Sequence, residues 1–149
     1  MIATYAATLL GIGRSPFAPG TVASMVALPI AWIAVTVGGS VALLSLALVT
    51  AVLGMWACDV YAKDKGAHDP SECVIDEVAG QFLACAFAPL SLAGFALVFL
   101  LFRLFDISKL WPISAAERLR GGLGIVADDL VAGLMAGLIV AVFASTGFI

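Results

Sequence analysis

Five acidic side chains stand where charged sequence gives way to long uncharged segments, and they are the residues best suited to chemistry. These acids are Asp76, Glu77, Asp106, Asp128 and Asp129. The uncharged, mostly apolar segments beside them run over 78–101 and 130–149. A carboxylate in or near hydrocarbon is costly, so its presence indicates a functional site. We therefore expect the five acids to converge on one site at a membrane surface.

Carboxylates brought close together repel one another, and each raises the pKa of its neighbours. A hard divalent cation removes that repulsion. Oxygen ligands suit Mg²⁺, which usually keeps some of its waters and binds through a few carboxylates and a substrate phosphate. The five acids are therefore predicted to be Mg²⁺ ligands, although one of them could instead orient an attacking water.

Cationic residues accompany one of these acids. Arg103, Asp106 and Lys109 are three residues apart, which places them on roughly one face of a helix. The spacing suits a surface ladder of salt bridges, which contributes little to stability. It equally suits a site in which Asp106 joins the acid cluster while Arg103 and Lys109 hold a substrate anion.

The loop from Gly11 to Thr21 offers a second set of anion-binding groups. Its prolines and glycines break any helix and leave backbone N–H groups free. Arg14 adds a forked cationic donor, and Thr21 or Ser24 is placed to cap a following helix. Because a helix N-terminus readily binds an anion, one reading of this segment is a phosphate-binding loop. The alternative is a polar hairpin between apolar segments, since the spacing matches no dinucleotide or Walker motif.

Signatures of covalent phosphatase chemistry are missing from the sequence. None of the cysteines, Cys58, Cys73 and Cys85, is followed by an arginine six positions later. The chain has one histidine and no DxDxT run. If the chain is a phosphatase, metal-assisted attack by water is the mechanism that remains.

The composition indicates an integral membrane protein. Of the 149 residues, 63% are apolar and 11% are charged, whereas a soluble domain is about half apolar and about a quarter charged. The chain lacks the basic patch that nucleic acid needs, so we expect no nucleic-acid partner. Its length fits one domain over residues 1–149.

The apolar segments predict an all-α membrane bundle with five short spans. Val22–Val37 and Val41–Ala57 are expected to form an antiparallel pair joined by a tight turn at 38–40. Leu130–Ile149 is expected to form the last span.

The middle segment, 78–102, has two possible arrangements. It is long enough to cross a bilayer once, but Pro89 at its centre favours a helical hairpin with arms of about 76–88 and 92–105. Lysines or arginines flank the segment on both sides. A hairpin would place both flanks in the cytoplasm, as the positive-inside rule requires. We therefore predict a hairpin and a polar cytoplasmic face.

Two of the predicted helices carry an acid above small residues at a spacing of four. One stripe is Asp76, Gly80 and Ala84, and the other is Asp129, Gly133 and Gly137. A spacing of four keeps residues on one helix face, and small residues let membrane helices approach closely. We predict that the stripes meet and bring their two acids together. The alternative is that the glycines only pack the helices and each acid reaches the surface alone.

Four ordered motifs resemble one known family. They are Gly13-Arg14-Ser15-Pro16 with Ala18-Pro19-Gly20-Thr21, then Ile75-Asp76-Glu77-Val78-Ala79-Gly80-Gln81, then Phe102-Arg103-Leu104-Phe105-Asp106-Ile107 with Lys109 and Trp111-Pro112, and finally Gly122-Leu123-Gly124-Ile125-Val126-Ala127-Asp128-Asp129 with Ala132-Gly133. Together they resemble the phosphatidylglycerophosphatase A family over nearly the whole chain. Small departures occur at Leu110, where proline is expected, and at Ala127, where a larger apolar residue is common. Neither is a proposed ligand.

The resemblance implies a multi-pass enzyme of the bacterial inner membrane, a Mg²⁺-dependent lipid phosphatase. Its substrate would be phosphatidylglycerophosphate in the bilayer, hydrolysed to phosphatidylglycerol and phosphate in phospholipid biosynthesis. The five acids are then the candidate catalytic and metal-binding residues. Arg14, Thr21, Arg103 and Lys109 are the candidate phosphate-binding residues.

Two other classes of protein fit part of the pattern. A small cation- or proton-coupled transporter also uses paired acids between helices, but it has little use for Arg14 or for the pair Arg103 and Lys109. A structural membrane protein does not explain five acids at apolar borders. Phosphate release with and without Mg²⁺ separates these classes from a phosphatase.

Overall fold

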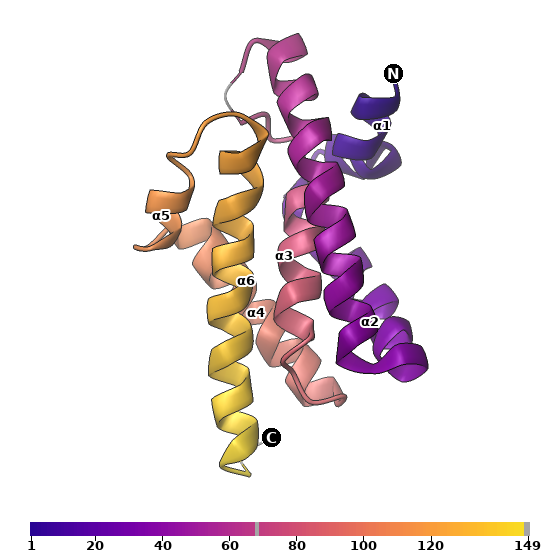
Figure 1. The fold of residues 1–149 in the computed structure, drawn as a ribbon, viewed down its shortest axis with the longest axis vertical. Coiled ribbons are helices and arrows are strands. Elements are labelled where there is room, and N and C mark those ends of the chain that lie inside the picture. The colour runs from indigo at the N-terminus through magenta and orange to yellow at the C-terminus, as the bar shows by residue number, and fades with distance from the viewer. Residues whose placement is uncertain (68, 148–149) are drawn as a thin grey trace.

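The computed structural model describes residues 1–67 and 69–147, and every regular element within them is helical, as predicted. Figure 1 shows how the helices are arranged. In chain order they are α1 (Ile2–Ala7), the 3₁₀ helix η1 (Leu9–Arg14), α2 (Pro19–Lys65), α3 (Ile75–Cys85), α4 (Leu92–Ser108), α5 (Ile113–Ala116) and α6 (Gly122–Ser145).

The long element α2 is a helical hairpin. Its chain reverses at Gly39, whose φ of 67° and ψ of −168° are not helical. Glycine adopts such a positive φ without the steric cost that a β-carbon brings. We call residues 19–38 the first arm of α2 and residues 40–65 its second arm. The predicted tight turn at 38–40 is confirmed.

The segment after the charged loop forms two helices, α3 and α4, as predicted, and not one long helix. Residues 86–91, which include Pro89, separate them. The hydroxyl of Ser91 accepts a hydrogen bond of 3.0 Å from the Gly94 N–H and thereby caps α4. The start of α3 and the end of α4 therefore lie at the same end of the bundle, where they line one pocket.

Two elements in the described part of the chain are long and apolar enough to cross a membrane, namely α2 with 47 residues and α6 with 24. The 11 residues of α3 extend only about 16 Å at 1.5 Å per residue. A complete span needs about 20 residues. The predicted number of five spans, and the side of the membrane that each end faces, therefore stay predictions.

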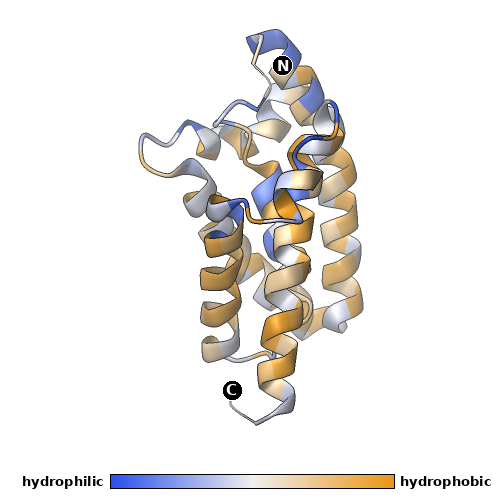
Figure 2. Ribbon diagram, turned by 90° about the vertical axis from the view of Figure 1, so that its left-hand side faces the viewer, coloured by the Kyte–Doolittle hydropathy of each residue, from blue (hydrophilic) through white to orange (hydrophobic). Residues whose placement is uncertain are grey.

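Hydrophilic residues gather toward one end of the bundle, and the opposite part is mostly hydrophobic (Figure 2). The sequence explains this division, because all charged residues lie at position 14, within 59–77 or within 103–129. Both hairpin turns, at Gly39 and around Pro89, lie in uncharged segments. The fold thus brings the charged segments together at one end.

Candidate active site

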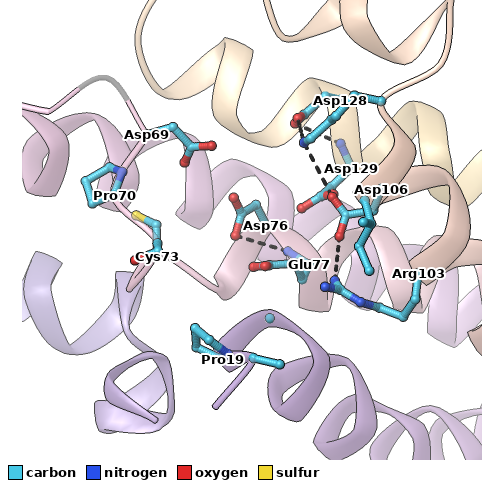
Figure 3. A pocket seen from close by; sticks show the side chains of 15 residues that line it. Pro19, Asp69, Pro70, Cys73, Asp76, Glu77, Arg103, Asp106, Asp128 and Asp129 are labelled. Atoms are coloured by element: carbon cyan, nitrogen blue, oxygen red, sulfur yellow. Dashed lines mark hydrogen bonds and ion pairs between the residues drawn. The ribbon is translucent and has the colours of Figure 1, made fainter. Parts of the chain in front are cut away.

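A pocket of about 300 Å³ opens at the charged end of the bundle. Figure 3 shows acidic side chains facing it from several directions, with Arg103 at one side and Pro19 below. The lining residues come from five segments, namely the start of α2 (Ala18, Pro19, Gly20), the loop before α3 (Asp69, Pro70, Ser71, Cys73), α3 itself (Asp76, Glu77), the end of α4 (Arg103, Asp106, Ile107, Lys109) and α6 (Asp128, Asp129).

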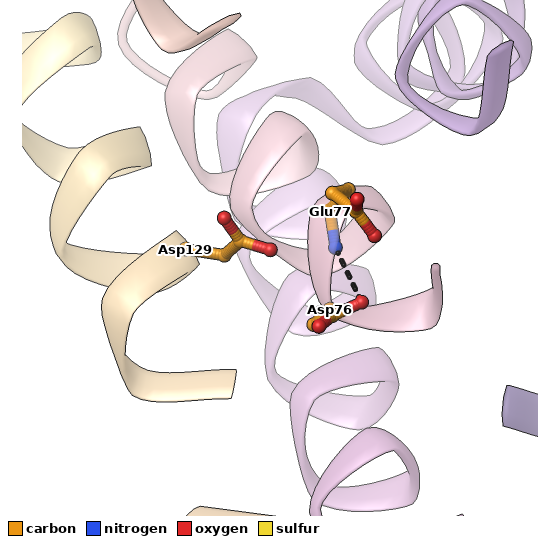
Figure 4. A group of neighbouring side chains, drawn as sticks. All are labelled: Asp76, Glu77 and Asp129. Carbon is orange, nitrogen blue, oxygen red and sulfur yellow. Dashed lines mark hydrogen bonds between the residues drawn. The ribbon is translucent and has the colours of Figure 1, made fainter. Parts of the chain in front are cut away.

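Three of the predicted acids form a compact triad. Asp76, Glu77 and Asp129 each offer one carboxylate oxygen, and these oxygens lie within 4.8 Å of one another. Figure 4 shows Asp76 and Glu77 on α3 with Asp129 facing them from α6. The side chain of Asp76 also accepts a hydrogen bond of 3.1 Å from the Glu77 backbone N–H. Sequence reasoning predicted this meeting of the two helices.

The stripes of small residues on α3 and α6 pack closely against each other, and this packing brings the acids of the triad together. A β-carbon on Gly133 of α6 would overlap the carbonyl oxygen of Gly80 on α3, and one on Gly80 would meet the carbonyl of Asp129 at 2.5 Å. Lower in the bundle, a β-carbon on Gly137 would stand 3.0 Å from the carbonyl oxygen of Ala84. The backbones are therefore in direct contact along both stripes. This confirms the predicted packing and explains why Asp76 and Asp129 face each other.

The chemistry of the triad fits a hard divalent cation. Asp76 and Asp129 are 5% and 2% exposed. The Oε2 atom of Glu77 and the Oδ1 atom of Asp129 are buried and have no hydrogen-bond partner among the described residues. Unpaired carboxylate oxygens are costly to bury, and three nearby carboxylates repel one another. A divalent cation bound by these oxygens would remove both costs.

The other two predicted ligands, Asp106 and Asp128, are held in ion pairs. Arg103 Nη1 lies 2.5 Å from Asp106 Oδ2, and Lys109 Nζ lies 3.4 Å from Asp106 Oδ1. Lys109 also donates to Asp128 Oδ2. All four residues still line the pocket. Among the described residues, the five acids thus divide into a triad that has no such ion pair and a neighbouring network of two acids and two cations.

Lys109 is positioned by the end of α4. It follows the last helical residue and adopts a left-handed conformation, with φ 47° and ψ 38°, which is uncommon for a residue with a β-carbon. Burial opposes the charged form of Lys109, but the ion pair with Asp128 and the nearby Asp129 and Asp106 outweigh burial and raise its pKa. Lys109 therefore stays protonated and positively charged at the pocket.

The start of α2 contributes backbone to the pocket. The sequence predicted that this loop takes part in the site, but not which of its residues line the pocket. The helix begins at Pro19, with Ala18 as its N-cap in a left-handed conformation (φ 40°, ψ 62°). A β-carbon on Gly20 would overlap Glu77 Oε1 and stand 3.3 Å from Arg103 Nη1. A larger residue at position 20 would make the Glu77 carboxylate move, so glycine lets the first turn of α2 lie against these two side chains as they stand. Pro19 and Gly20 were the residues in the sequence that could have indicated this close approach.

The two predicted phosphate ligands of the N-terminal loop lie outside the pocket lining. Arg14 ends η1 and is exposed, while Thr21 lies within the first turn of α2 and does not line the pocket. Arg14 is near Glu72, whose pKa is lowered mainly by its 3.0 Å ion pair with Lys65 and further by Arg14. Neither Thr21 nor Ser24 is the cap of α2, because the helix starts before both. Their contact with a phosphate stays a prediction.

Sequence comparison assigns a family to this arrangement. The sequence profile of the family described as phosphatidylglycerophosphatase A matches residues 5–144. That range contains every residue of the triad and of the ion-pair network. No solved structure matches the chain significantly.

Two of the three relatives described next carry the same name as the profile. A phosphatidylglycerophosphatase A of Escherichia coli is 35% identical over 128 residues, covering 84% of this chain and 73% of the relative. Its counterpart in Haemophilus influenzae is 36% identical over 132 residues, covering 87% and 81%. A putative phosphatidylinositol-3-phosphatase of Bacteroides thetaiotaomicron is 35% identical over 149 residues, covering 91% and 89%.

Proposed function

The chain belongs to the phosphatidylglycerophosphatase A family, and we propose that it hydrolyses phosphatidylglycerophosphate to phosphatidylglycerol and inorganic phosphate with the help of Mg²⁺. The reaction would take place at the cytoplasmic surface of a bacterial inner membrane. The charged end of an apolar helical bundle suits a substrate whose acyl chains stay in the bilayer while its phosphate reaches the pocket.

One observation carries the proposal, namely that the acid triad and the cations Arg103 and Lys109 line the same pocket. The triad supplies oxygen ligands for Mg²⁺, and the cations supply donors for a phosphate. The buried Nε of Arg103 has no hydrogen-bond partner among the described residues, which leaves a spare donor for the substrate. A cation transporter would not need positive side chains at this point.

Asp76, Glu77 and Asp129 would hold the cation. When bound, it supplies Lewis-acid stabilisation of the charge that develops on the phosphoryl oxygens. The ion pairs with Asp106 and Asp128 fix the side chains of Arg103 and Lys109 before substrate arrives, so that little reorganisation is needed as charge develops. The first turn of α2 lies beside Arg103, and the N–H groups of a first helical turn have no partner within their own helix, so they would add donors for an anion.

The bond changes are those of phosphomonoester hydrolysis. Water attacks phosphorus and gives up a proton to a carboxylate of the cluster. The bond between phosphorus and the glycerol oxygen breaks, and that oxygen takes up a proton to become the hydroxyl of the product. Orientation of the water and of the phosphate contributes much of the rate in such a site.

A second candidate substrate is the phosphomonoester of another lipid. The Bacteroides thetaiotaomicron relative is named a putative phosphatidylinositol-3-phosphatase and matches 91% of this chain. The same triad and cations would cleave that ester by the same reaction. The two candidates differ in the alcohol that leaves, which the pocket must accommodate.

Phosphate release by the purified protein in detergent micelles tests both candidates. Phosphatidylglycerophosphate and phosphatidylinositol 3-phosphate are compared at equal surface concentration with Mg²⁺, and Asp129→Asn provides the inactive control. Asp64→Asn is the matched control, because Asp64 is an exposed acid at the end of α2. We expect higher kcat/KM for phosphatidylglycerophosphate. Preference for the inositol lipid would reverse the assignment, and release from neither would exclude lipid phosphatase activity on these substrates.

A further inference from the structure

The first arm of α2 and helix α4 touch at two points that lie at different depths in the bundle. At the charged end, Gly20 packs so closely that a β-carbon on it would stand 3.3 Å from Arg103 Nη1. At the apolar end, the rings of Trp32 and Phe95 meet edge to face, with centroids 5.0 Å apart and planes at 68°. These two contacts bracket a stretch along which the two helices run in opposite directions.

An apolar hollow occupies the lower part of that stretch. It measures about 380 Å³, and its lining comes from these two helices alone, namely Leu28, Pro29, Trp32, Leu92, Phe95 and Ala96. No charged residue occurs between positions 15 and 58 or between 78 and 102. The hollow is therefore suited to hydrocarbon and to no polar group.

Each helix carries a stripe of residues at helical spacing that runs from the hollow toward the charged end of the bundle. On α2 the stripe is Thr21, Met25, Leu28 and Trp32, and on α4 it is Leu92, Ala96, Phe99 and Arg103. Both follow spacings of four and three, which keep residues on one helix face. The α4 stripe ends at Arg103, which lines the pocket that holds the acid triad.

The length of this path matches the depth of one leaflet. From Gly20 to Trp32 is 12 residues of helix, or about 18 Å, and from Phe95 to Arg103 is 8 residues, or about 12 Å, at 1.5 Å per residue. Half of a hydrocarbon core of ~30 Å is ~15 Å. A chain whose headgroup sits at Arg103 would thus end near the middle of the bilayer, beside Trp32.

We propose that the groove between the first arm of α2 and α4, defined by these two stripes, holds one acyl chain of the lipid whose phosphate occupies the pocket. This inference rests on the proposed function and adds a route by which the substrate enters sideways from the bilayer. The phosphate meets Arg103 at the upper end of the groove, and the chain follows Phe99, Ala96 and Leu28 to the hollow.

The main effect of the groove would be to orient the lipid, and not to increase its affinity. Lipid tails are as apolar as the groove, so moving a chain from bilayer to groove brings little hydrophobic gain. A chain held along α4 instead fixes the direction from which the headgroup approaches Arg103. Blocking the groove should therefore raise KM for a long-chain substrate by about tenfold or less, and tenfold corresponds to 1.4 kcal/mol.

Photolabelling tests occupancy without requiring turnover. The probe is a phosphonate analogue of phosphatidic acid, which is not hydrolysed, with a diazirine at the end of one acyl chain. The comparison probe is a diacylglycerol with the same chains. We expect the phosphonate probe to label 28–32 and 92–96, which line the hollow, more strongly than the exposed face of α6 at 134–143, and the diacylglycerol to label all three evenly. Even labelling by the phosphonate probe would overturn the proposal.

A pair of substitutions tests the consequence for turnover. Ala96→Trp fills the hollow, whereas Ala93→Trp places the same bulk on an exposed alanine of α4 that does not line it. We expect Ala96→Trp to raise KM for a long-chain substrate, to leave a short-chain analogue unaffected and to reduce labelling by the phosphonate probe. Equal effects of both variants on the two substrates would contradict a chain-binding groove.

The two experiments separate this inference from the proposed function. If the wild type releases no phosphate from any lipid yet the phosphonate probe labels the groove, the proposed reaction is wrong and the groove stands. If phosphate is released but labelling is even, only the groove is wrong. Thermal stability in detergent checks that Ala96→Trp is folded, and the labelling pattern of the wild type remains decisive if it is not.

Discussion

The carbonyl oxygen of Gly80 on α3 lies only 2.2 Å from the point where a β-carbon on Gly133 of α6 would stand. The two backbones are therefore in contact one turn below the acids Asp76 and Asp129. This contact sets the separation of the two helices, and the separation in turn sets the distance between the carboxylates of the triad.

Adding a single methyl group at this contact should separate the triad. Gly133→Ala must push α6 away from α3, and such overpacking typically costs about 1–3 kcal/mol. We expect a lower melting temperature in detergent together with reduced phosphate release. Leu134→Ala is the control, because Leu134 is 40% exposed on the neighbouring position of the same helix. Unchanged stability and activity in Gly133→Ala would contradict the close packing.

Metal binding should be visible in stability as well as in activity. Mg²⁺ that binds the folded state raises the melting temperature, and a chelator should abolish phosphate release. Asp76→Asn and Asp129→Asn each remove one negative charge while nearly keeping the side-chain shape, so both should fold, lose activity and show a smaller Mg²⁺-dependent increase. An inactive variant that keeps the full increase would make that aspartate a base and not a ligand.

Arg103 and Arg118 should differ sharply in their effect on catalysis. Arg103 lines the pocket and pairs with Asp106, whereas Arg118 is exposed between α5 and α6. Losing a charge-assisted contact in the transition state costs ~3–4 kcal/mol, or about 10²–10³ in rate. We expect Arg103→Ala to lose that much in kcat and Arg118→Ala to stay near wild type. Arg103→Lys, which keeps the charge but loses the fork, should recover part of the loss. Equal, small effects of Arg103→Ala and Arg118→Ala would contradict the assignment.

Both flanks of the α3–α4 hairpin should face the cytoplasm. Single cysteines at Ala67 and Ala115, both exposed, are introduced into a chain from which Cys58, Cys73 and Cys85 have been replaced. A membrane-impermeant thiol reagent should reach both only after the inner membrane is opened. Labelling of one position alone in spheroplasts would show that the flanks lie on opposite sides, and labelling of both would place both flanks outside.

Features that depend on local spacing could be predicted from the sequence. The stripes at spacing four predicted which faces of α3 and α6 meet, because a helix repeats about every four residues. Pro89 predicted the break between α3 and α4, because a proline inside a helix removes a hydrogen bond and clashes with the preceding turn. In both cases a single helix or turn contains the whole signal.

Contacts between distant segments could not be predicted where neither segment carries a repeating pattern. Lys109 pairs with Asp128, which lies 19 residues further along the chain, and no local pattern indicates this partner. The division of five acids into a triad and an ion-pair network follows from that contact. Similarly, the start of α2 at Pro19 places backbone, and not the side chain of Thr21, at the pocket.

The hairpin turn at Gly39 and the turn that contains Pro89 have a consequence for biogenesis. Both lie at the end of the bundle away from the pocket, inside segments without a charged side chain. A charged side chain at the centre of a membrane helix costs ~2.5–3.5 kcal/mol during insertion by the translocon. Each hairpin can therefore enter the bilayer tip first without carrying such a charge across it. The five candidate acids would then stay on the side of synthesis throughout, and under the proposed function insertion itself would determine which compartment supplies the metal and receives the phosphate.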